Sequence, residues 1–202
     1  MGLLFLNCFY QLRKVAFVQS NQRILLLLGP SGCGKTTLGQ KLAEVGIPEL
    51  VSHTTRTMRK GEIPGRSYHF VTPEEFENIP MIESVCYAGK HYGISHEEVQ
   101  SKLNEYSQVF ATVDINGVRR MKEAFGALVT VCFIQADEAV LAARMRNRGD
   151  AEELVEQRLA YMKDHAEAEN YRYADVVIDN TKSLDYAWEQ LYQVVKRLPV
   201  AG

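Results

Sequence analysis

The sequence predicts an α/β fold with a central parallel sheet between two layers of helices. Short apolar runs, which are typical of strands buried on both faces, alternate along the chain with segments whose apolar residues recur at helical spacing. The first such run, residues 24–28, ends in a glycine-rich loop that leads directly into a helical pattern. Alternation of strands and helices is typical of a doubly wound sheet with parallel strands.

The remaining elements of this core follow the same alternation. Further strands are predicted at residues 109–113, 128–134 and 176–178. Helices are predicted at residues 35–45, 116–125, 137–147 and 151–170. In a closing helix, one face is formed by Leu184, Trp188, Leu191, Val195 and Leu198. The helix that begins at Lys35 is expected to stop at Gly46, because glycine readily ends a helix in the left-handed conformation.

Residues 52–100 have a different composition, rich in Tyr, His, Gly and charged residues. Strand-like pieces occur around 68–71 and 81–88, and two capping-box patterns begin at Thr72 and Ser95. We therefore predict a folded insertion in a core that comprises residues 22–51 and 107–198. Residues 1–21 are a separate extension of uncertain role.

The loop after the first strand satisfies the phosphate-binding pattern GxxxxGK[ST]. Its glycines allow backbone N–H groups to surround a phosphate at the positive end of the following helix. Lys35 can reach the β- and γ-phosphates, and the Thr36 hydroxyl can ligate Mg²⁺. A chance match is the alternative, but the flanking strand and helix favour binding of a purine triphosphate. The predicted ATP contacts in this loop are Gly29, Pro30, Ser31, Gly32, Cys33, Gly34, Lys35, Thr36 and Thr37.

Two further features suggest phosphate chemistry. Asp114 ends a predicted strand. A carboxylate at this place in a phosphate-loop protein can lie near Mg²⁺ and the acceptor phosphate, but many strands end in Asp only because it starts a turn. Arg56 and Arg59 are close enough in sequence to grip one phosphate, although a solvated basic loop is equally consistent with their spacing.

The segment VSHTTRTMRKGEIPGRSYHFVTPEEF, residues 51–76, resembles the acceptor-binding segment of guanylate kinases, which transfer a phosphoryl group from ATP to GMP. The resemblance covers about residues 23–198. It implies a P-loop NTPase fold of three layers, α/β/α, with a small GMP-binding subdomain inserted at about 52–100 and a short helical lid at about 144–160.

The resemblance also implies roles for individual residues. Glu83 would read guanine, and Asp179 and Asn180 would contact adenine. The residues that would hold the rest of GMP are Ser52, Arg56, Arg59, Tyr68, Tyr92 and Asp114. Lys35, Arg59, Arg148 and Arg158 would be the catalytic cations, converging with Mg²⁺ on the transferred phosphoryl group.

Two positions and one segment depart from the family pattern. Ile94 stands where a hydroxyl residue is usual, so the sequence leaves guanine selectivity open unless Ser95 supplies the hydroxyl instead. Thr112 replaces a common acidic residue, and the segment 149–158 is shorter than expected for the lid. Two alternative functions therefore remain: a kinase of the same fold with a different acceptor, and a non-catalytic module that binds phosphopeptides. The intact phosphate loop is evidence against the second.

Charge balance, cysteine spacing and the length of the N-terminal apolar run indicate which binding partners and which compartment to expect. The 202 residues carry 23 Lys and Arg against 25 Asp and Glu, whereas a general nucleic-acid binder normally has a positive excess. The cysteines have neither zinc-finger nor CxxC spacing, which favours reduced, buried thiols in the cytoplasm. The apolar run at residues 1–10 is too short to span a membrane. We expect a cytoplasmic monomer or homodimer with ATP and GMP as partners and no nucleic-acid or membrane partner.

Overall fold

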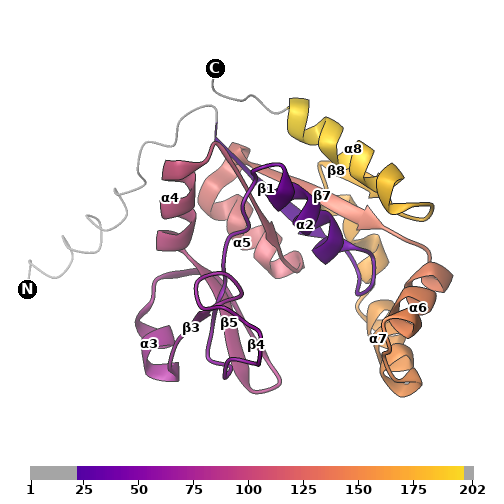
Figure 1. Ribbon diagram of the computed structural model, residues 1–202, viewed down its shortest axis with the longest axis horizontal. Coiled ribbons are helices and arrows are strands. Elements are labelled where there is room, and N and C mark those ends of the chain that lie inside the picture. The colour runs from indigo at the N-terminus through magenta and orange to yellow at the C-terminus, as the bar shows by residue number, and fades with distance from the viewer. Residues whose placement is uncertain (1–21, 198–202) are drawn as a thin grey trace, which may run out of the picture.

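The computed structural model describes residues 22–197, so the predicted extension at residues 1–21 lies outside the described part of the chain. Its core is a parallel sheet of four strands in the order β6-β1-β7-β8 (Figure 1). These strands are β1 (Arg23–Leu28), β6 (Gln108–Thr112), β7 (Val129–Gln135) and β8 (Val176–Asp179). Strand β1 pairs with both β6 and β7, and Leu25 lies opposite Phe110 on one side and Thr130 on the other. The predicted parallel sheet is confirmed.

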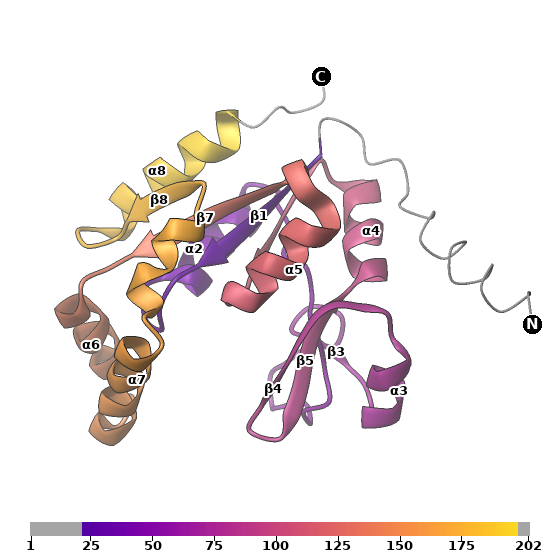
Figure 2. The same cartoon turned by 180° about the vertical axis from the view of Figure 1, so that it is seen from behind.

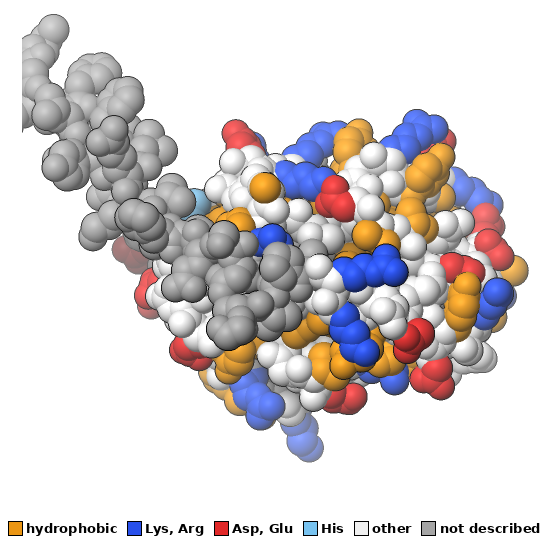
Figure 3. Space-filling view, turned by 90° about the horizontal axis from the view of Figure 1, so that it is seen from above, with side chains coloured by type: hydrophobic (Ala, Val, Ile, Leu, Met, Phe, Trp, Pro, Cys, Tyr) orange, Lys and Arg blue, Asp and Glu red, His pale blue; other side chains and the backbone are white. Residues whose placement is uncertain are grey.

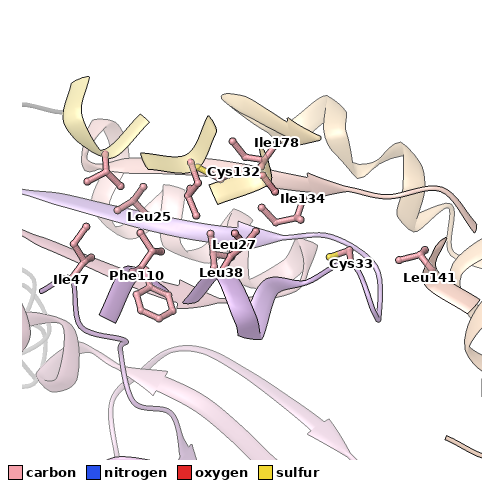
Figure 4. Close-up of a cluster of buried hydrophobic side chains, with 14 of the residues drawn as sticks. Leu25, Leu27, Cys33, Leu38, Ile47, Phe110, Cys132, Ile134, Leu141 and Ile178 are labelled. Carbon is pink, nitrogen blue, oxygen red and sulfur yellow. The ribbon is translucent and has the colours of Figure 1, made fainter. Parts of the chain in front are cut away.

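Helices cover both faces of this sheet because the side chains of β1 alternate between two cores. Leu25 and Leu27 pack with residues of α2 (Lys35–Glu44) and α8 (Leu184–Arg197), as the close-up in Figure 4 shows for part of the cluster. Leu26 packs on the opposite face with residues of α4 (His96–Glu105) and α5 (Ile115–Phe125). The predicted arrangement of three layers is confirmed.

A second, smaller sheet is formed within residues 53–95, inside the predicted insertion. Its strand order is β3-β2-β5-β4. The elements of this region are β2 (His53–Thr54), β3 (His69–Phe70), α3 (Pro73–Asn78), β4 (Met81–Tyr87) and β5 (Lys90–Ser95). At the start of α3, Thr72 and Glu75 form both hydrogen bonds of the predicted capping box.

The second capping box is only half formed. Ser95 Oγ accepts from the N–H of Glu98, as predicted, at 3.1 Å. The Glu98 carboxylate does not return to the backbone of Ser95, because its two oxygens bind Val51 and His69 instead. The prediction of a complete capping box was wrong at this helix.

The single helix predicted at residues 151–170 is interrupted. After α6 (Glu138–Asn147), helix α7 (Glu152–Asp164) ends, and a 3₁₀ helix (Glu167–Tyr173) follows. Between them Ala166 adopts the left-handed conformation, with φ of 47°. The 3₁₀ helix contacts β7, and Tyr171 packs edge-on against Phe133 at 6.4 Å between ring centroids. This tertiary packing explains why helical periodicity alone overestimated the length of α7.

On the described surface, charges of both signs are interspersed, as the view in Figure 3 shows for one face. No helix among residues 22–197 is sufficiently long and apolar to cross a lipid bilayer. Of the described cysteines, Cys33 and Cys132 are buried, whereas Cys86 on β4 is exposed, contrary to the expectation that the thiols are buried.

The insertion and the α6–α7 pair project from the carboxyl edge of the core sheet, on either side of the loop that follows β1 (Figures 1 and 2). The carboxyl ends of parallel strands are where α/β proteins bind ligands. The same edge carries Asp114, two residues after β6 and at the N-cap of α5, and Asp179, at the end of β8.

Candidate functional site

The loop between β1 and α2 has the backbone geometry of a phosphate cradle. Gly29, Gly32 and Gly34 have φ values of 148°, 82° and 104°, in a region that residues with a Cβ rarely adopt. A Cβ on Gly29 would lie 2.5 Å from the carbonyl oxygen of Ile134, so the loop also packs closely against β7. Gly34 is the N-cap of α2, which places the loop at the positive end of that helix.

The side chains of the loop divide into exposed and buried groups. Ser31, Thr36 and Thr37 are exposed, whereas Cys33 is fully buried, and burial raises the pKa of its thiol. Lys35 Nζ folds over the loop and donates to the carbonyl oxygens of Gly29 and Pro30 at 2.6 and 3.0 Å. The residues that carry hydroxyls are therefore accessible to a ligand, the ammonium group of Lys35 is held over the loop by two carbonyl oxygens, and Cys33 serves packing.

Asn180 braces this loop from the end of β8. Its Nδ2 donates to the carbonyl oxygen of Cys33 at 2.8 Å, and its Oδ1 and backbone oxygen accept from Arg144 Nη2 at 3.3 and 3.0 Å. Asn180 is only 1% exposed, so both ends of its side chain are used inside the protein. Asp179 accepts from the backbone and hydroxyl of Thr181, which lowers its pKa and stabilises the same turn.

Arg144 is a site residue that our sequence reasoning did not identify. It lies beside the loop in an open pocket of about 410 Å³, whose lining also includes Ser31, Lys35, Thr36 and Arg148. Its Nη1 is buried and makes no hydrogen bond within the described residues. The spacing of Arg144 and Arg148, four residues apart near the end of α6, could have signalled that both face one side.

The two predicted lid arginines meet at one carboxylate. Arg148 Nε and Nη2 donate to Asp150 at 2.9 and 2.6 Å, and Arg158 Nη1 donates to the same carboxylate at 2.6 Å. The hydrogen bonds from Arg148, together with the positive charges of Arg148 and Arg158, lower the pKa of Asp150. The structure therefore brings Arg148 and Arg158 together, with a carboxylate in a position that suits an anion.

On the insertion, several of the predicted phosphate ligands also lie together. The guanidinium carbon of Arg56 lies 5.3 Å from the centre of the Tyr68 ring, and that ring lies 5.9 Å from the ring of Tyr92. Glu62 accepts two hydrogen bonds from Arg56, at 2.6 and 3.1 Å, and one from the backbone of Arg59. The hydrogen bonds from Arg56 lower the pKa of Glu62, so a carboxylate holds this arginine in place. Ser52 is half-buried, and its carbonyl oxygen accepts from the backbone of His69, next to Tyr68; Arg59 is exposed.

A second open pocket, of about 780 Å³, lies between β4 and the N-terminal part of α5. Glu83 and Asp114 both line it, and one oxygen of Asp114 accepts from the backbone of Gly117 at 2.8 Å. Burial, together with the nearby charge of Asp114, raises the pKa of Glu83 to about 7. Two carboxylates thus face a pocket that can admit a planar base.

The protein-family model described as guanylate kinase matches residues 21–198. The chain belongs to the guanylate kinase family. A relative named guanylate kinase from Gloeobacter violaceus is 34% identical over 188 residues, which cover 89% of this chain and 92% of the relative. Another, from Desulfotalea psychrophila, is 39% identical over 145 residues, which cover 68% of this chain and 71% of the relative.

The same family is found among solved structures. The crystal structure of guanylate kinase from Anaplasma phagocytophilum matches with a TM-score of 0.67 and 25% identity, covering 91% of this chain and 89% of the other. The predicted fold and family are therefore confirmed. The roles of individual residues inferred from the resemblance stay predictions.

The departure from the guanylate kinase pattern at Ile94 has a structural explanation. Ile94 is 1% exposed and packs in the core beside Leu26, Ile82 and Val99. Ser95, which we considered as a substitute hydroxyl, is equally buried, and its oxygen caps α4. Neither residue lines the pocket that contains Glu83, whereas the hydroxyl residue Ser84 does.

Proposed function

We propose that this protein transfers the γ-phosphoryl group of ATP to GMP, giving ADP and GDP. The observation that carries this proposal is the position of two sites at one edge of the core sheet. One is an intact phosphate loop, and the other is a pocket with the carboxylates of Glu83 and Asp114. Membership of the guanylate kinase family supports the same activity.

Selection of guanine follows from the chemistry of a carboxylate. Ionised Glu83 would accept hydrogen bonds from N1–H and the 2-amino group of guanine together. Adenine offers neither donor, and a buried acceptor left without a partner costs about 1–3 kcal/mol. Asp114 would add a second acceptor in the same pocket, since one of its oxygens is already committed to the N-terminus of α5.

The GMP phosphate would bind between Arg56, Tyr68 and Tyr92, with Ser52 and Arg59 completing the site. Glu62 supports this role because it orients the guanidinium of Arg56 before any ligand arrives. Preorganisation of this kind lowers the entropy cost of binding.

Transfer would require positive charge around the migrating phosphoryl group. Lys35, Arg59, Arg148 and Arg158 would supply it, and the anionic GMP phosphate needs no general base to attack. Movement of the α6–α7 lid over the site would exclude water and so suppress hydrolysis of ATP. Arg148 and Arg158 would then exchange Asp150 for phosphate oxygens.

The residues at the start of α2 fit a magnesium ion. Thr36 is exposed beside Lys35 in the pocket of the phosphate loop, and its hydroxyl is the oxygen donor that phosphate loops offer to Mg²⁺. When bound with ATP, Mg²⁺ supplies neutralisation of phosphate charge. Asp179, the last residue of β8, would contact the adenine end of ATP. Asn180, whose side chain is committed to Cys33 and Arg144, would support this end of the site from behind.

We expect the protein to act in the cytoplasm as a monomer or homodimer on these small-molecule substrates. The test is release of ADP from Mg-ATP with GMP, dGMP, AMP, CMP, UMP or IMP, and without acceptor. Turnover confined to GMP and dGMP supports the proposal, and preference for another acceptor overturns the substrate. Absence of turnover with every acceptor, despite ATP binding, would favour the phosphopeptide-binding module. Lys35→Ala should reduce kcat by about 100-fold or more, because one preorganised cation is lost.

A further inference from the structure

Glu98 is a buried carboxylate outside the predicted catalytic and binding residues. It lies in the first turn of α4 and is 8% exposed. Its Oε1 accepts from the backbone N–H of Val51 at 2.8 Å, and its Oε2 lies 2.9 Å from Nε2 of His69, which donates to it. A buried carboxylate is costly unless its oxygens are satisfied, and here each oxygen has a partner.

The two partners of Glu98 adjoin predicted GMP-phosphate ligands. Val51 immediately precedes Ser52, and His69 immediately follows Tyr68. The backbone N–H of His69 also donates to the carbonyl oxygen of Ser52 at 2.9 Å, which closes a small network around one carboxylate. Glu98 therefore fixes the separation of two chain segments that both approach the predicted phosphate site.

The network connects the insertion with the core. Val99 and Leu103, on the same helix as Glu98, are buried in the core cluster that contains Ile24 and Leu26 of β1. Helix α4 is thus attached to the sheet that carries the phosphate loop. Through Glu98, this helix holds β3 and the segment that leads into β2 at a set position relative to that sheet.

A purely local role for Glu98 would look different. A glutamate at this position of a helix normally returns to the N-cap backbone, as Glu75 does at the start of α3. Glu98 instead directs its carboxylate toward two other segments of the chain. The ring of His53 packs at a tilt of 30° against that of His69, with centroids 4.6 Å apart, and limits the movement of the histidine that Glu98 binds.

We propose that Glu98 is a positioning residue for GMP binding, which sets the geometry of Ser52 and Tyr68 through Val51 and His69. This inference rests on the proposed function. It assigns no direct contact with GMP to Glu98. Loss of the carboxylate is expected to weaken binding of GMP while leaving the ATP site intact, because Glu98 does not line the pocket of the phosphate loop.

Steady-state kinetics of three variants test this inference. Glu98→Ala removes both hydrogen bonds and should raise KM for GMP about tenfold or more, with KM for ATP within about twofold of the wild type. Glu98→Gln keeps an oxygen that can accept from Val51, so its KM for GMP should lie between those of wild type and Glu98→Ala. Glu97→Gln is the matched control, because it removes the same charge from the exposed side of the same helical turn and should leave both KM values unchanged.

Thermal unfolding of each variant, measured alongside, separates positioning from stability. If Glu98→Ala does not fold, Glu98→Gln decides the question. Equal changes in both KM values, unchanged KM for GMP, or an equal effect of Glu97→Gln would overturn the inference. Wild-type protein that turns over no GMP would instead overturn the proposed function, so the two failures are distinguishable.

Discussion

Asn180 donates a hydrogen bond from its side chain to the carbonyl oxygen of Cys33 at 2.8 Å, across 147 residues of chain. The contact joins the turn after β8 to the middle of the phosphate loop. Gly34 makes it possible, because a Cβ at that position would collide with the Asn180 amide. The third glycine of the loop is therefore required both for its φ of 104° and for this close approach.

Replacing Asn180 with alanine should disturb the loop that it braces. The carbonyl of Cys33 and the guanidinium of Arg144 would both lose a partner, which costs about 1–3 kcal/mol of unfolding free energy. We expect KM for ATP to rise more than KM for GMP. Urea unfolding and steady-state kinetics measure the two effects, with the exposed Asn104→Ala as control. An unchanged KM for ATP in a destabilised variant would show that the brace matters only for folding.

Conservative substitution of the lid arginines should separate charge from geometry. Arg148→Lys and Arg158→Lys each keep the charge but lose the planar fork that now holds Asp150. We expect kcat to fall about 10- to 100-fold in each variant, with a smaller change in KM, because the fork acts on the transferred phosphoryl group. Arg146→Lys is the control, since Arg146 is exposed in α6, two residues before Arg148, and pairs with Glu152. Full activity of both lid variants would contradict a catalytic role for these side chains.

The raised pKa of Glu83 predicts an effect on stability. Because the folded-state pKa of about 7 lies above the ordinary value of 4.5, ionisation of Glu83 disfavours the folded state as pH rises between these values. Glu83→Gln should therefore be more stable than wild type at pH 8, by up to about 3 kcal/mol. The difference should shrink as pH falls toward 4.5. Denaturant unfolding across this range measures it, and a constant difference would show that Glu83 does not titrate in this way.

The same ionisation predicts a pH dependence of substrate binding. Only ionised Glu83 can accept both donors of guanine, so KM for GMP should rise as pH falls below about 7. KM for ATP over the same range serves as the control. In Glu83→Gln, KM for GMP should be high at every pH, and this variant should lose preference for GMP over AMP. A wild-type KM for GMP that does not vary with pH would argue against Glu83 as the residue that reads the base.

Restoring the hydroxyl of the family pattern at position 94 should not increase the selectivity of the enzyme for GMP. Ile94 is buried among apolar side chains, so Ile94→Thr would place a hydroxyl in the core and remove packing, at a cost of about 1–3 kcal/mol. We expect a lower melting temperature and an unchanged preference for GMP over IMP. A gain in this preference would show that residue 94 reaches the base after all.

Local sequence patterns were sufficient to predict most of the strands and helices of the core. An apolar run such as β1 followed directly by a glycine-rich loop and a helix is a sequence pattern that few other structures share. It can be recognised from the sequence because all of its residues are close together in the chain. The exposed Thr72 and Glu75 likewise formed the capping box that their spacing predicts. The same pattern at Ser95 and Glu98 formed only one of its two hydrogen bonds. The buried carboxylate of Glu98 instead accepts from donors that the tertiary fold brings close to it.

The sequence by itself determined the parallel core, the phosphate loop and the family, because these depend on residues close together in the chain. Only the tertiary structure decided that Asn180 braces the loop and binds Arg144, that Arg148 and Arg158 share Asp150, and that Ile94 is buried in the core. It also decided where α7 ends, through the packing of Tyr171 on Phe133. The physical reason is that burial and hydrogen-bond partners depend on segments far apart in sequence, and no local spacing encodes which of them will meet.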